Sequence, residues 1–151
     1  MNNEKSLYCI IVTLFVSVLS AISIAEAYQQ LRKPDNVYIK YQTSQGSATI
    51  GLYDYAAKSL TGKMKDSCFQ QSSENSIDLL STNSGCQESY DLFRKVVDIY
   101  EELLRETADP ESGNVSRVQI IRVKISGKET LMSLSMIVDK KNMIVTSLGL
   151  D

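Results

Sequence analysis

The longest apolar stretch of the chain lies near its N-terminus, where residues 7–25 (LYCIIVTLFVSVLSAISIA) include no charged side chain. An α-helix rises about 1.5 Å per residue, so a helix of this length matches the roughly 30 Å hydrocarbon core of a bilayer. The apolar part of a signal peptide is usually shorter, about 7 to 15 residues. The pattern therefore predicts a transmembrane helix over 7–25, after a short cytoplasmic tail (1–6) and before a juxtamembrane helix or linker (26–35).

Two features concern whether this segment is cleaved and which way it is oriented in the membrane. Ser23, Ala25 and Ala27 have the spacing that signal peptidase requires, so cleavage is an alternative to a retained anchor. Basic residues stand on both sides of the apolar run, so the positive-inside rule does not decide its orientation. The short tail before the run and the long portion after it favour a cytoplasmic N-terminus and a periplasmic domain over residues 36–151.

Polar and apolar residues alternate over residues 37–43, which predicts a half-buried strand. A turn at 44–46 and a returning strand over 48–55 complete a hairpin. Between residues 56 and 67 the signals conflict, and the segment is either a short helix or an irregular strand extension. The stretch that follows, to residue 84, is expected to be loop with at most one helical turn around 77–80.

A long amphipathic helix is predicted over residues 87–107. Ser84 and Gln87 have the spacing of a capping box, and Pro and Gly within 108–114 mark the end of the helix. The apolar positions recur at steps of three and four residues and form a broad stripe that must be buried. They are Leu92, Phe93, Val96, Val97, Ile99, Tyr100, Leu103 and Leu104.

Three β-rich segments follow, over residues 115–126, 129–139 and 143–148. The connections between them are hairpin-sized, which predicts an antiparallel meander. The fold class is therefore α+β, with the order ββαβββ. A small antiparallel sheet is expected to pack against one long helix.

The composition excludes several classes of function. The chain has no histidine, which excludes Ser-His-Asp and Cys-His nucleophiles and zinc sites that include histidine. Its net charge of −2 does not provide the positive field on which nucleic-acid binding depends. Aspartate and glutamate are scattered without a catalytic motif. We expect a binding protein that uses no cofactor or metal and is not an enzyme.

The cysteines point to an oxidising compartment. Cys9 lies inside the apolar run, whereas Cys68 and Cys86 flank a polar stretch rich in serine and asparagine. In an exported domain these two would form a disulfide, which stabilises a loop of this size by about 3 kcal/mol in the chain-entropy model. The alternative is a pair of unrelated free thiols.

Four tyrosines, Tyr38, Tyr41, Tyr53 and Tyr55, cluster in the predicted first hairpin. They are candidates for a surface that binds a partner or a small amphipathic ligand. The alternative is that they pack near sheet edges and satisfy their hydroxyl groups locally. Three methionines in the last two strands, Met132, Met136 and Met143, line an adaptable apolar pocket or belong to the core.

The layout resembles the small accessory proteins encoded beside ToxR-like membrane transcription activators, the ToxS, PsaF and FidL-like group. The resemblance rests on a short tail (MNNEKS), one spanning run (7–25) and a β-rich domain that reaches the C-terminus. It implies a single-pass inner-membrane protein that forms a heterodimer with a membrane-bound regulator. The periplasmic domain would stabilise that regulator and help it sense envelope signals, and only the regulator would contact DNA.

The alternative function is a freely secreted periplasmic domain that binds a small amphipathic ligand or inhibits a target protein. Mass spectrometry of the mature N-terminus separates the two. We expect the chain to retain residues 1–6, because the apolar run is long enough to stay in the membrane. A first residue at Glu26 or Tyr28 would instead support secretion.

Overall fold

The structure, a computed structural model, describes residues 36–80, 85–106 and 113–151. The predicted membrane segment and its linker lie outside these residues. Within the described ranges, no helix is both long and apolar enough to cross a bilayer. The two longer helices are α2 (Asp54–Thr61) and α3 (Gln87–Arg105), and a short 3-10 helix, η1, covers Asp66–Cys68.

Seven strands form one mixed sheet in the order β3-β4-β1-β2-β7-β6-β5. The strands are β1 (Asn36–Thr43), β2 (Gly46–Tyr53), β3 (Phe69–Ser73), β4 (Ser76–Leu79), β5 (Asn114–Ile125), β6 (Lys128–Asp139) and β7 (Ile144–Leu150). Strand β1 is parallel to β4, and β2 is parallel to β7, whereas the other neighbours are antiparallel. The α+β class is confirmed, but the prediction of a purely antiparallel sheet is wrong.

The elements with strong periodicity are confirmed. The first hairpin is β1–β2, the long helix is α3, and the last three strands form the antiparallel meander β5–β6–β7. The predicted returning strand extended to residue 55, but β2 ends at Tyr53 and α2 begins at once. Because Ala56, Ala57 and Leu60 of α2 are buried on one side, the conflicting segment is resolved as a short helix.

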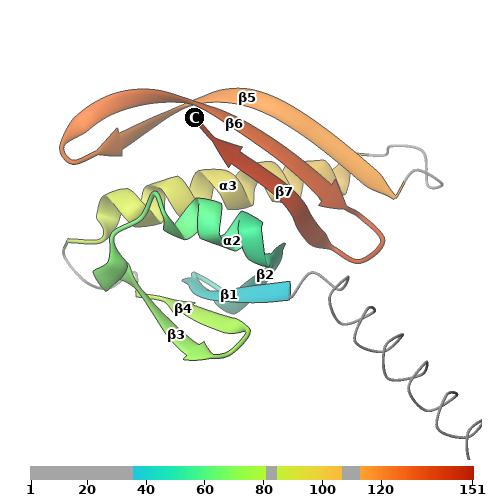
Figure 1. The fold of residues 1–151 in the computed structure, drawn as a ribbon, viewed down its shortest axis with the longest axis horizontal. Coiled ribbons are helices and arrows are strands. Elements are labelled where there is room, and N and C mark those ends of the chain that lie inside the picture. Colours follow the sequence, from blue (N-terminus) through green and yellow to red (C-terminus); the bar gives the residue numbers. More distant parts are fainter. Residues whose placement is uncertain (1–35, 81–84, 107–112) are drawn as a thin grey trace, which may run out of the picture. The chain divides into compact units, whose positions relative to one another are not determined.

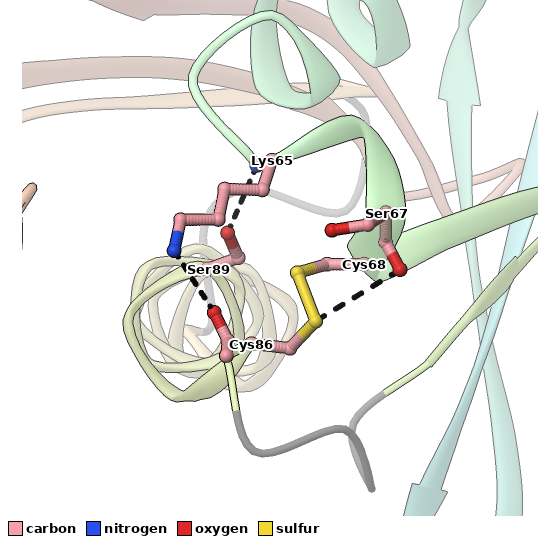
Figure 2. Close-up of a disulfide and its surroundings, with 6 residues drawn as sticks. Lys65, Ser67, Cys68, Cys86 and Ser89 are labelled. Carbon is pink, nitrogen blue, oxygen red and sulfur yellow. Dashed lines mark hydrogen bonds between the residues drawn. A yellow bond between two sulfur atoms is a disulfide. The ribbon is translucent and has the colours of Figure 1, made fainter.

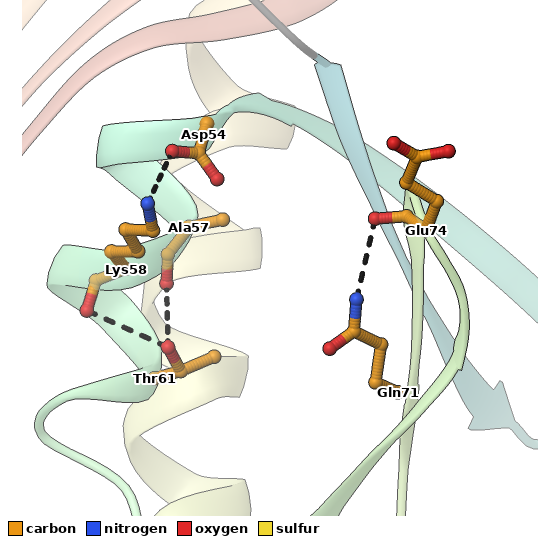
Figure 3. A network of polar contacts seen from close by, with 6 residues as sticks. All are labelled: Asp54, Ala57, Lys58, Thr61, Gln71 and Glu74. Carbon is orange, nitrogen blue, oxygen red and sulfur yellow. Dashed lines mark hydrogen bonds and ion pairs between the residues drawn. The ribbon is translucent and has the colours of Figure 1, made fainter.

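The expected loop before residue 84 contains the hairpin β3–β4, so the predicted helical turn at 77–80 is wrong and the predicted order ββαβββ omits two strands. Strand β3 (FQQSS) is mostly exposed and has no alternation of apolar side chains to reveal it. The hairpin forms because β4 pairs with β1 through the backbone, a contact that side-chain periodicity does not encode. In the turn, the Gln71 side chain donates to the Glu74 carbonyl (3.4 Å, Figure 3).

Helix α2 is held by local polar contacts on its exposed side. The Lys58 ammonium lies 2.7 Å from the Asp54 carboxylate, and the Thr61 hydroxyl donates to the Ala57 carbonyl at 3.0 Å (Figure 3). Both the ion pair and the hydrogen bond have the i,i+4 spacing that supports a helical turn. These contacts are exposed or partly buried, so the buried apolar side of α2 fixes its position.

The core is built around α3. Figure 1 shows this helix beneath the long β5–β6 hairpin, with α2 and the β1–β2 hairpin on its other side. Phe93 of α3 is fully buried, and its ring meets the Tyr41 ring of β1 edge-on at 5.0 Å. The Tyr100 hydroxyl donates to the Met143 carbonyl at 2.9 Å, at the turn between β6 and β7. Helix α3 therefore contacts strands on both sides of the β2–β7 pair.

The predicted disulfide is present and links η1 to the start of α3. Cys68 and Cys86 are buried, with their Cα atoms 5.4 Å apart. Beside the bond, the Lys65 backbone N–H donates to the Ser89 hydroxyl at 3.0 Å (Figure 2). Cys86 occupies the N-cap position of α3 and makes no side-chain cap. Ser84, the proposed first residue of a capping box, lies outside the described residues.

Removing the disulfide should destabilise the domain. For the double variant Cys68→Ser/Cys86→Ser, we expect a loss of about 3 kcal/mol in the free energy of unfolding, because the unfolded chain regains the freedom of the closed loop. Urea titration with and without reductant measures the loss, and Cys9→Ser is the matched control. Equal stability of the oxidised and reduced wild-type chain would contradict this role.

The turn between β6 and β7 depends on a carboxylate. Asp139 accepts hydrogen bonds from the Asn142 side chain (2.6 Å) and from the backbone N–H groups of Asn142 and Lys141. The Asn142 side-chain bond is the largest cause of a lowered Asp139 pKa, and the two backbone bonds add to it. The ionised carboxylate therefore stabilises the turn.

The stabilisation by Asp139 should depend on pH. Because its pKa is lower in the folded state, its contribution is complete above the unfolded-state pKa of about 3.9 and is lost as the pH falls through the folded-state value. We expect Asp139→Asn to lower the urea midpoint at pH 6 and to match the wild type well below pH 3.9. A difference that is constant across this range would show that the charge is not involved.

Candidate binding surface

Strands β5 and β6 expose apolar side chains on the face turned away from the helices. On the inner face, residues such as Ile121, Val123 and Leu134 are buried in the core. On the outer face, four large apolar side chains are exposed, and we call them the outer stripe. They are Val118 (74% exposed), Ile120 (62%), Leu131 (65%) and Ile137 (39%).

The register shows that the outer stripe is continuous. Ile137 lies opposite Ser116, which places it diagonally beside Val118. Leu131 lies opposite Arg122, which places it diagonally beside Ile120. Diagonal neighbours in an antiparallel pair are about 7 to 8 Å apart, within reach of large side chains. The four residues therefore form one apolar line across the hairpin.

The surroundings of the stripe keep it accessible. Ser133 and Ser135 lie opposite Ile120 and Val118, and Gly149 of β7 extends the same face beside Ser135. These residues are small and do not cover their apolar neighbours. Helices α2 and α3 pack on the inner face, and no other described element lies over the outer one (Figure 1). A contiguous exposed apolar patch of this kind is typical of an interaction site.

The structure separates the four tyrosines that the sequence grouped. Tyr41 is only 6% exposed and packs on Phe93, so its assignment to a binding surface is wrong. Burial is the largest cause of the raised pKa of its hydroxyl, with Glu101 adding to the effect. Tyr38 and Tyr55 are 43% and 56% exposed. Tyr53 is partly buried, and its ring lies 6.0 Å from the Tyr55 ring.

Two of these tyrosines are held in place by the sheet. The Tyr55 hydroxyl donates to the Thr146 carbonyl of β7. The Tyr38 ring packs over the backbone of Gly51, where a Cβ atom would lie 3.2 Å from Tyr38 Cε1. The hydroxyl of Tyr55 is therefore satisfied locally, as the packing alternative predicted. Whether Tyr38 and Tyr55 also contact a partner stays a prediction.

The predicted methionine pocket does not form as one cavity. Met132 and Met136 are buried in the core, whereas Met143 is exposed. Two grooves lie at the surface, and polar and apolar groups line both. The larger, of about 430 Å³, lies between α3 and β5–β6, and the smaller, of about 200 Å³, lies beside Met64 and Ser89. The larger is lined by Asp91, Arg94, Lys95, Asp98, Arg122, Val123, Lys124 and Glu129.

The charges in the larger groove do not cancel locally. Arg94 and Asp98 pair with each other at 3.1 Å. Lys124 and Glu129 lie directly opposite in the β5–β6 register. Asp91, Lys95 and Arg122 take no part in the ion pairs of the described residues. With four basic and three acidic side chains in its lining, the groove carries one positive charge in excess.

Sequence reasoning missed the outer stripe, although a signal was present. In the segment VQIIRV (118–123), apolar residues occupy both even and odd positions, so one set must face away from the core.

Among the described residues, no three potential metal ligands lie together. No family model matches the chain, and no curated protein or solved structure has significant similarity to it.

Proposed function

We propose that this chain is a single-pass inner-membrane protein whose periplasmic domain binds and stabilises a partner protein. The partner is a membrane-bound transcription regulator of the ToxR-like kind, and the complex senses envelope signals. The observation that carries the proposal is the outer stripe, four large apolar side chains exposed on one face of the β5–β6 hairpin.

The energetics of the stripe support recognition of a protein. Burying a valine, leucine or isoleucine side chain completely contributes about 1.5 to 3 kcal/mol. A partner that covered the stripe would gain several such contributions, which offset part of the translational and conformational cost of association. The serines between the apolar side chains supply hydroxyl groups for hydrogen bonds to the partner.

The disulfide supports an oxidising compartment. Disulfides persist in exported domains and are rare in the cytoplasm. The Cys68–Cys86 bond closes the segment that contains the β3–β4 hairpin, whose first strand is mostly exposed. The uncharged run at 7–25 provides the anchor in this proposal. The absence of histidine is consistent with recognition rather than general acid–base chemistry.

The test is co-purification of the full chain from detergent with a ToxR-like regulator encoded beside its gene. We expect Val118→Lys/Ile120→Lys to weaken binding at least tenfold, because two apolar contacts are replaced by charges that must be desolvated. The matched control is Gln45→Lys/Gln70→Lys, which adds the same charge at exposed positions outside the stripe.

The control should bind like the wild type, and both variants should keep the wild-type urea midpoint, which shows that the fold is intact. A stripe variant that folds and still binds the regulator with unchanged affinity would overturn the assignment of the outer stripe. Failure of the wild-type chain to bind the regulator at all would overturn the proposed partner.

A further inference from the structure

We infer that a second copy of this chain pairs antiparallel with the free edge of β5 and forms a two-fold symmetric dimer. Strand β5 is the last strand of the sheet, and all twelve of its residues pair with β6. On the other side of β5, no strand of the described chain supplies partners. Every second residue of such an edge leaves its backbone N–H and C=O groups available for another strand.

The centre of the edge lacks the usual protection against pairing. Proteins commonly protect edge strands with proline, bulges, short length or charged side chains, and in β5 the charged residues Arg117, Arg122 and Lys124 lie on either side of the centre. Strand β5 contains no proline, pairs with β6 without a register shift and spans twelve residues. Its centre is exposed and uncharged, with Val118, Gln119 and Ile120 in sequence. These features make β5 an available template for another strand.

The sequence of β5 is compatible with itself in the antiparallel direction. A two-fold axis at Gln119 places Val118 opposite Ile120 of the second copy, so β-branched side chains meet at the centre. The same axis places Arg122 opposite Ser116 and Lys124 opposite Asn114. Like charges do not face each other at any position of this register, so no cross-strand repulsion opposes it.

The charges at the two ends of the edge do not oppose this pairing. Near the start of β5, the carboxylates of Glu102 and Glu106 share the guanidinium of Arg117, and the Lys140 ammonium donates to the Glu106 carbonyl, so the charges balance there. Toward its end, four basic and three acidic side chains line the groove between α3 and β5, which leaves one positive charge in excess. Antiparallel pairing brings the start of one edge beside the end of the other, so the excess positive charge of one copy meets a balanced cluster of the other.

Pairing would also enlarge the surface in the proposed function. Val118 and Ile120 from both copies would lie side by side, and the two outer stripes would merge into one apolar face. The dimer itself does not depend on the identity of the regulator. Its failure is therefore distinguishable from failure of the proposed function.

Cysteine cross-linking of the full chain in detergent tests the dimer. In a Cys9→Ser background, Gln119→Cys places two thiols across the axis, where antiparallel neighbours have Cα atoms about 4.5 to 5.5 Å apart, close enough for a disulfide. We expect mild oxidation to convert most of the chain to a covalent dimer. The control, Thr49→Cys on the interior strand β2, should stay mostly monomeric.

A mixture of Asn114→Cys and Lys124→Cys chains tests the register, because cross-links should form between the two variants and not within either one. Gln119→Lys places like charges across the axis and should raise the dimer dissociation constant at least tenfold by analytical ultracentrifugation, with an unchanged urea midpoint. Equal cross-linking of Gln119→Cys and Thr49→Cys, or a wild-type chain that sediments as a monomer, would overturn the inference.

Discussion

The packing of α3 against the inner face of the sheet is the constraint on which the rest of the structure depends. Strands β2 and β7 share only two paired positions, Gly51 with Ile144 and Leu52 with Val145. So short a parallel contact cannot by itself fix the position of β3, β4, β1 and β2 relative to β7, β6 and β5. Helix α3 joins them, because Phe93 packs on Tyr41 of β1 while the Tyr100 hydroxyl reaches the turn after β6. The disulfide holds the start of this helix to η1.

This arrangement leaves the outside of the sheet as the surface for the proposed recognition. The inner faces of β1, β2, β5, β6 and β7 all contribute to one core around α3 and α2, and the larger groove described above is lined mainly by charged side chains. The outer face of β5–β6 is left with apolar side chains that stability of the isolated domain does not require. The proposed function, binding of a partner, needs such a face, and the free β5 edge adjoins it.

The sequence predicted what side-chain periodicity encodes. Apolar residues that recur at steps of three and four predicted α3 almost to its end. The short loops at Gly127 and Lys140 predicted the antiparallel meander. Strand β3 was missed because it is a polar edge strand that pairs through its backbone and shows no alternation. Strand β4 was missed because its four residues are too few to show one. Tyr41 was misassigned because its place against Phe93 is a contact between distant segments. The outer stripe was missed because residues 115–126 were predicted only as a strand, and their apolar residues were not assigned to its two faces.

Hydroxyl-radical footprinting of the full chain, with and without the regulator's periplasmic domain, tests the central claim most directly. The account predicts that Ile120, Leu131 and Ile137 lose reactivity in the complex, while the exposed Met143 keeps its reactivity. Unchanged reactivity along the outer stripe in a complex that demonstrably forms would contradict it.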